Sequence, residues 1–166
     1  MMFSQAKARP PRSLPGKIRQ CGSTVVEFAI IAPAFLLLMI GIIELSMAYF
    51  ANLTMQHAVR EAARYSVTGN NDLDPNASNQ QRYQAVMQKM KDSSMGMFDK
   101  TNPVISVSVN GHASGGGSFG NAGDIVVITV NCSWAFATPL MAAIFKGNQA
   151  HFAVAATMRN ESFGGL

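Results

Sequence analysis

The sequence contains few of the residues that build disulfide frameworks or metal centres. It has two cysteines, Cys21 and Cys132, and three histidines, His57, His112 and His151, among 166 residues. The histidines lie far apart in the sequence, and no cysteine or carboxylate recurs beside them at the spacing of metal ligands. We therefore expect no metal site and no cofactor, and we expect each histidine to be a surface or packing residue.

Complete motifs of nucleotide binding and catalysis are also missing. The glycine-rich stretch at 115–123 is not followed by the Lys-Ser or Lys-Thr pair of a phosphate-binding loop. No pattern pairs a nucleophile with a base. The sequence therefore predicts no enzyme and no catalytic residue.

Acidic residues are absent from the start of the chain. Before the first carboxylate, Glu27, there are five basic residues: Lys7, Arg9, Arg12, Lys17 and Arg19. Such an imbalance holds the N-terminus of a membrane protein in the cytoplasm and sends the remainder outward. The rest of the chain carries eight Lys and Arg against nine Asp and Glu, so the net charge of +4 belongs to this segment. We therefore expect no nucleic-acid partner.

A long apolar run follows the basic segment. From Val25 to Ile43, Glu27 is the only ionisable residue. About 20 apolar residues in a helix are long enough to cross the hydrocarbon core of a bilayer. The run therefore predicts a transmembrane helix with the lipid bilayer as a partner, the N-terminus in the cytoplasm and the remainder outside.

A secretory signal peptide and a lipoprotein signal are the alternatives. The apolar part of a signal peptide is about 7–15 residues long and ends at a small-residue cleavage site. This run is longer and continues into helical sequence without a break, and Gly22 precedes it. Cys21 also precedes the run, which argues against a lipoprotein.

The helix is predicted to continue beyond the bilayer to about Val67. Apolar residues recur at a spacing of three or four, with polar residues mainly on the other side, which is typical of an amphipathic helix. We place Glu44 at the outer membrane interface, as an interfacial residue more than a buried partner. The predicted apolar stripe is Met47, Phe50, Leu53, Met55, Ala58, Ala62 and Tyr65.

Residues 68–166 are predicted to form a small α+β head. Residues 80–92 have helical periodicity, whereas 104–109 alternate and 125–130 are mostly β-branched, as in strands. A third strand at about 151–158 would complete an antiparallel sheet against the amphipathic half of the long helix. The fold class is therefore α+β, with a long N-terminal transmembrane and amphipathic helix packed on a small antiparallel sheet.

The residues from Cys21 to Gly69 resemble the TadE-like family, small pseudopilins of the tight-adherence (Flp-type) branch of type IV pili. The positions that carry the resemblance are Gly22, Val26-Glu27-Phe28, Pro33, Gly41, Glu44 and the sequence AVREAARY at 58–65. Two departures occur, Ala63 where the family often has glycine, and the inserted Val59. The resemblance covers about the first third of the chain, and more weakly the segments 125–140 and 152–161, which look like the family's closing strands.

The resemblance implies cleavage between Gly22 and Ser23 by a prepilin peptidase, which would remove the basic leader, residues 1–22. It also implies that Glu27, with Phe28, sets the register between subunits by pairing with the new amino group of Ser23. Glu27 alternatively lies only in the headgroup zone. Pro33 is interpreted either as a helix kink used in filament packing or as an ordinary proline of a membrane helix.

The function that the resemblance implies is that of a minor pseudopilin, which primes or caps a tight-adherence pilus for adhesion or secretion. The expected partners are the peptidase, other pilins and pseudopilins, and pilus assembly proteins of the bacterial inner membrane, with the head in the periplasm. A major pilin of such a system would be much shorter. The alternative is an uncleaved, membrane-tethered module whose head binds a partner outside the cytoplasm.

Overall fold

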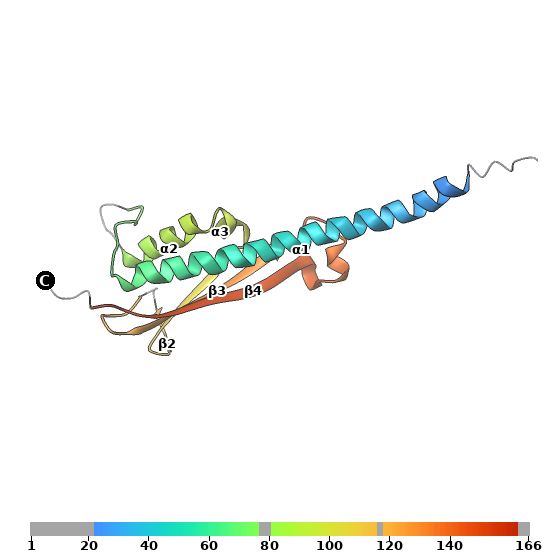
Figure 1. Cartoon of the computed structure of the whole chain (residues 1–166). Coiled ribbons are helices and arrows are strands. Elements are labelled where there is room, and N and C mark those ends of the chain that lie inside the picture. Colours follow the sequence, from blue (N-terminus) through green and yellow to red (C-terminus); the bar gives the residue numbers. More distant parts are fainter. Residues whose placement is uncertain (1–21, 77–80, 116–117, 163–166) are drawn as a thin grey trace, which may run out of the picture. The chain divides into compact units, whose positions relative to one another are not determined.

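The computed structural model describes residues 22–76, 81–115 and 118–162. The chain divides into two compact units, Met1–Leu38 and Met39–Leu166. Of the predicted leader, only Gly22 lies within the described residues. The elements in chain order are α1 (Ser23–Val67), α2 (Arg82–Ser93), α3 (Met97–Lys100), β1 (Val104–Val109), β2 (His112–Ala113), β3 (Ile125–Ala135), η2 (Met141–Ala143), η3 (Lys146–Asn148) and β4 (Gln149–Arg159) (Figure 1).

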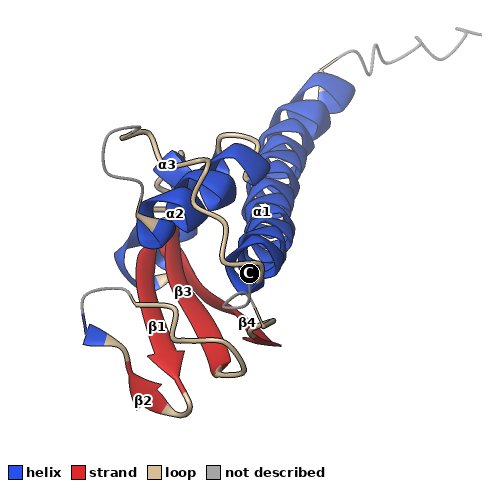
Figure 2. Ribbon diagram, turned by 90° about the vertical axis from the view of Figure 1, so that its left-hand side faces the viewer, coloured by secondary structure: helices blue, strands red, loops and turns tan. Residues whose placement is uncertain are grey.

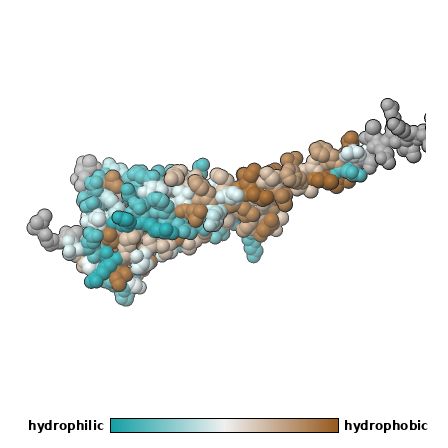
Figure 3. Space-filling model, in the orientation of Figure 1, coloured by the Kyte–Doolittle hydropathy of each residue, from teal (hydrophilic) through white to brown (hydrophobic). Residues whose placement is uncertain are grey.

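The predicted long N-terminal helix is present as α1, a single helix of 45 residues that continues through Pro33. Its first half is long and apolar enough to cross a membrane, by length and composition. The described part of the first unit consists of this helical segment, and its apolar side chains are largely exposed, with Phe28 at 71% and Leu36 at 59%. Figure 3 shows the resulting hydrophobic surface along the helix.

The second unit contains a four-stranded antiparallel sheet in the order β2-β1-β3-β4. The two longest strands, β3 and β4, pair along their whole length, from Ile125 opposite Arg159 to Ala135 opposite Gln149. The second half of α1 and the helices α2 and α3 cover one face of this sheet (Figure 2). The predicted α+β class with an antiparallel sheet is confirmed.

The core lies between the helices and this face of the sheet. Alternate residues of β3 point inward, so Val126, Ile128 and Val130 are almost fully buried. They pack in one cluster with apolar side chains of α1 and α2, namely Ala51, Met55, Ala58, Val59, Ala62, Ala63, Val86 and Met90. Four of the six α1 residues are alanines, which let the helix backbone approach the sheet closely.

The structure corrects part of the predicted amphipathic stripe. Met55, Ala58 and Ala62 are buried as predicted, but Met47, Phe50 and Leu53 are 43–46% exposed. The side of α1 that faces the sheet instead runs through Ala51, Val59 and Ala63. The apolar residues between 42 and 53 surround the helix more completely than one stripe requires, so periodicity alone did not identify the face that is buried.

The predicted strand boundaries also change. β3 extends to Ala135 and β4 begins at Gln149, because the two strands pair with each other well beyond the β-branched segment. The short elements β2 and α3 were not predicted. Both are turn-like pieces of two and four residues, too short for a periodic pattern.

Candidate functional site

Gly22 lies in the turn that precedes α1. Its carbonyl oxygen accepts the hydrogen bond of the Val26 N–H at 3.3 Å, so the first helical turn begins at this residue. A Cβ atom added to Gly22 would meet no atom within 4 Å, and its φ is not positive. Among the residues that the structure describes, there is therefore no steric reason for glycine at this position.

Glu27 and Phe28 lie at the beginning of α1, and both side chains are exposed. Four residues separate Ser23 from Glu27, which is about one helical turn. Pro33 is inside the helix and does not end it. The roles of Glu27 and Phe28 in subunit registration and of Pro33 as a kink stay predictions.

Glu44 of α1 makes a polar contact with the loop that follows β3. Its carboxylate accepts a hydrogen bond from the Thr138 N–H at 2.7 Å and another from the Thr138 hydroxyl at 3.0 Å. The side chain is only 9% exposed. One turn earlier, a Cβ added to Gly41 would lie 3.2 Å from the Met141 side chain. The loop after β3 thus packs closely on α1 at these two positions.

We predicted that Glu44 lies at the membrane interface and is not a buried partner. The structure contradicts the second half of this prediction, because Glu44 is buried and bonded to Thr138. The cause is a contact between residues 94 positions apart, which no local pattern reports.

A second polar cluster, which the sequence did not indicate, lies around Arg82 at the start of α2. Its guanidinium donates to the carbonyl of Ser66 near the end of α1, to the carbonyl of Gly120 at 3.0 Å and to the Asn160 side chain at 3.1 Å. The Asn160 amide in turn donates to the carbonyls of Phe119 and Asn121. A cation at the C-terminal end of α1 also interacts favourably with the helix dipole. This cluster joins α1, α2 and the end of β4, and its role is structural.

In the part of the chain that the structure describes, no group of side chains is placed to hold a metal. The histidines lie on α1, β2 and β4, and no set of three His, Cys, Asp or Glu side chains suited to a metal occurs among the described residues. Ser118 has Gly-x-Ser-x-Gly spacing, but the chain continues from it into β3 without the helix that such a nucleophile elbow requires.

Cys132 is a buried thiol on the inner face of β3, 3% exposed. Burial raises the pKa of this thiol, although a hydrogen bond with Thr101 acts in the opposite direction. A thiol held neutral by its surroundings is a poor nucleophile and a poor metal ligand. Cys132 is therefore a buried thiol that packs in the core.

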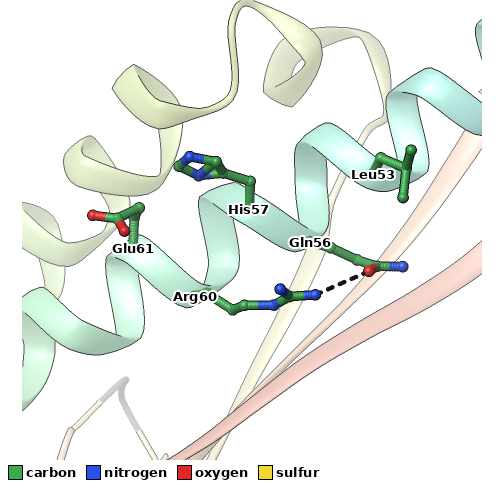
Figure 4. Close-up of a pocket in the computed structure, with 5 residues that line it drawn as sticks. All are labelled: Leu53, Gln56, His57, Arg60 and Glu61. Atoms are coloured by element: carbon green, nitrogen blue, oxygen red, sulfur yellow. Dashed lines mark hydrogen bonds between the residues drawn. The ribbon is translucent and has the colours of Figure 1, made fainter.

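A shallow hollow lies along the exposed surface of α1 and is lined by Leu53, Gln56, His57, Arg60 and Glu61 (Figure 4). Arg60 donates to the Gln56 side chain at 3.2 Å. His57 and Glu61 point to one side of the helix, and Gln56 and Arg60 point to the other. Because these groups do not converge on one point, they do not form a reaction centre.

The chain thus combines a helix fit to cross a membrane with an α+β unit in which the same helix covers an antiparallel sheet. A family model described as TadE-like protein matches residues 22–64, which confirms the resemblance and makes this segment TadE-like. The match covers about a quarter of the chain, from Gly22 through most of α1. No curated protein and no solved structure matches the chain. The likeness to the TadE-like family is thus shown for residues 22–64.

Proposed function

We propose that the protein is a minor pseudopilin of a tight-adherence pilus. In this proposal a prepilin peptidase cleaves it after Gly22, and it then primes or caps the filament together with other pilins and pseudopilins. Inner-membrane assembly proteins extract it from the bilayer. The pilus serves surface adhesion or secretion.

The observation that carries this proposal is the position of the helix start. α1 begins at Ser23, directly after the last residue of the predicted leader, inside the segment that matches the family model. Cleavage after Gly22 would leave the helix whole and place a new amino group on its first residue. Since nothing in the fold requires glycine at position 22, a requirement for glycine would belong to the peptidase, whose active site must accommodate the backbone there.

The ionisable groups at the start of α1 support the same proposal. The new amino group of Ser23 would be positive, and Glu27 one turn later is the only ionisable residue of the apolar run. An ionisable residue in a membrane segment is costly and usually has a functional partner. We propose that Glu27 pairs with the amino group of a neighbouring subunit and so sets its register, with Phe28 packed beside it.

The orientation follows from charge. The five basic residues of the leader hold the N-terminus in the cytoplasm, which puts the sheet in the periplasm of a bacterial inner membrane. The Glu44 contact with Thr138 would then fix the head to the periplasmic end of the membrane span.

The pairing role of Glu27 is tested with Glu27→Ala in a strain that lacks the native copy. Cleavage should continue, because the residues at the cut are unchanged, but the fraction of the protein recovered in sheared pili should fall strongly. Glu161→Ala is the matched control, since this exposed glutamate lies beyond β4. Normal incorporation of Glu27→Ala into pili would refute the pairing.

The second candidate is an uncleaved membrane-tethered module. The observation that favours it is the folded head of the second unit, whose core is formed by residues between 51 and 158. Retention of residues 1–22 on the protein from native membranes would select this candidate.

A further inference from the structure

The loop between β3 and β4 is unusually apolar for a surface connection. Residues 136–148 read FATPLMAAIFKGN, and Lys146 is the only ionisable residue among them. No Asp or Glu occurs between Asp124 and Glu161. A connection between two strands that is exposed only to water usually carries polar residues, so this composition requires an explanation.

The loop has a defined structure. The Phe136 N–H donates to the Asn148 carbonyl at 3.0 Å, and the Asn148 side chain donates back to the Phe136 carbonyl at 3.0 Å, which closes the loop at its base. The rings of Phe136 and Phe145 pack with their centroids 4.9 Å apart. Inside the loop, the Phe145 N–H donates to the Met141 carbonyl at 2.7 Å. Its exposed apolar atoms are therefore held in place and are not the result of a loose segment.

The apolar loop lies beside the end of the apolar run of α1. Thr138 contacts Glu44 and Met141 packs on Gly41, so the loop is level with the last turn of the run that ends at Ile43. Ile144 of the loop is 70% exposed, and Ile43 of α1 is 57% exposed. Figure 3 shows hydrophobic surface over the loop and the adjoining part of α1.

We propose that this loop inserts into the outer interface of the membrane that α1 spans. The exposed side chain of Ile144 contacts the acyl chains, and Lys146 reaches the phosphate headgroups. The proposal rests on the membrane span of the proposed function. Lipid is the occupant that the observations favour, because the loop is continuous with the side of a helix that is itself in lipid at the same level.

The charges of the region fit the same occupant. A lysine with an apolar stem places its ammonium group at the headgroups while its stem lies along apolar surface. The absence of carboxylates from the loop avoids repulsion by anionic lipids. Tyr49, which is 64% exposed and follows Glu44 by little more than one turn, lies where aromatic side chains are enriched at membrane interfaces.

The sheet supplies a reference position at the opposite end of the same unit. His112 of β2 pairs with Val109, which pairs with Val126, whereas the loop follows Ala135 at the other end of β3. Nine residues of extended strand separate these two ends, which is about 30 Å. A bilayer in contact with the loop therefore leaves His112 in water.

The test measures the depth of single tryptophans in the full-length chain, reconstituted into vesicles of phosphatidylcholine and phosphatidylglycerol. The chain has one native tryptophan, Trp134, so a Trp134→Phe background is silent. Three probes are introduced separately: Ile144→Trp in the loop, His112→Trp at the far end and Phe35→Trp in the span. All three positions are exposed, so the substitutions do not enter the core, and circular dichroism checks the fold.

Quenching by lipids brominated on their acyl chains then reports the position of each probe. We expect Ile144→Trp to lose most of its emission and to emit at shorter wavelength, and His112→Trp to be unaffected. An unquenched Ile144→Trp beside a quenched Phe35→Trp overturns this proposal and leaves the anchor intact. If the emission of the unquenched Ile144→Trp is nevertheless shifted to shorter wavelength, a protein surface rather than lipid covers the loop. An unquenched Phe35→Trp removes the membrane span, and with it both this proposal and the proposed function.

Discussion

The carboxylate of Glu44 on α1 accepts two hydrogen bonds from Thr138, one from the backbone N–H at 2.7 Å and one from the hydroxyl at 3.0 Å. The contact joins a helix residue to the loop after β3 across 94 positions of sequence. It satisfies a nearly buried carboxylate with two donors from one residue. The head is thereby fixed to α1 directly after the apolar run.

Loss of this contact should loosen the loop. Glu44→Leu leaves the Thr138 N–H and hydroxyl without their acceptor, and we expect a loss of about 1.5–3 kcal/mol in the free energy of unfolding. Thr138→Val removes only the hydroxyl bond and should cost less. Thermal unfolding of the full-length chain in detergent, followed by circular dichroism, measures both. Thr157→Val, at an exposed position of β4, is the control. Equal stability of Glu44→Leu and the native chain would contradict this account of the contact.

Gly41 tests the close packing of the same loop. In Gly41→Ala the new methyl group meets the end of the flexible Met141 side chain at 3.2 Å, which can shift by a few tenths of an ångström. We expect a change within about 1 kcal/mol, because alanine also favours the helix by up to that amount. Gly41→Leu should displace Met141 and destabilise the chain. A Met141→Ala change should recover part of that loss, and a double-mutant cycle measures the coupling. Strict additivity of the two changes would show that the residues do not interact.

Arg82 should be among the most sensitive polar residues of the head. In Arg82→Ala the carbonyl oxygens of Ser66 and Gly120 lose a charged donor, and we expect a loss of about 2–3 kcal/mol in the free energy of unfolding. Arg82→Lys should recover only part of the lost stability, because a single ammonium group cannot bond to Ser66, Gly120 and Asn160 at once. Arg60→Ala is the matched control and should change the stability by less than about 0.5 kcal/mol, since Arg60 is exposed. Similar losses in Arg82→Ala and Arg60→Ala would show that the cluster is not structural.

Cys132 should be inert in the folded protein. Burial raises the pKa of its thiol, so at pH 8 less of it is thiolate than of an exposed cysteine, and reagents reach it slowly. We expect slow labelling by a maleimide in a Cys21→Ser background and fast labelling in denaturant. A Ser106→Cys, Cys132→Ser chain should label fast without denaturant, because Ser106 is exposed on β1. Rapid labelling of native Cys132 would place the thiol at an accessible surface.

Much of the fold could be predicted because its signals are local. The apolar run from Val25 to Ile43 determines the long helix, and β-branched residues between Ile125 and Val130 determine the central strand. The exposure of Phe50 and Leu53 could not be predicted, because apolar residues surround α1 there and the buried face is chosen by the sheet. Strand pairing likewise extends β3 to Ala135, beyond its β-branched part.

The candidate site divides in the same way. The roles of Gly22, Glu27 and Pro33 stay predictions, which rest on one short stretch that resembles a family. The partner of Glu44 and the contacts of Arg82 were missed, because Thr138 and Asn160 are 94 and 78 positions away. Side-chain contacts over such separations depend on the finished fold, and a single sequence carries no local signal of them.

Processing after Gly22 is tested most directly by the intact mass of the protein from native membranes, with and without the cognate prepilin peptidase. The proposed function predicts a chain that begins at Ser23 when the peptidase is present, and a full-length chain when it is absent or when Gly22 is replaced by leucine. A full-length chain under both conditions would contradict the pseudopilin assignment and favour the tethered module. A cut after the apolar run, near Glu44, would identify a secretory signal instead.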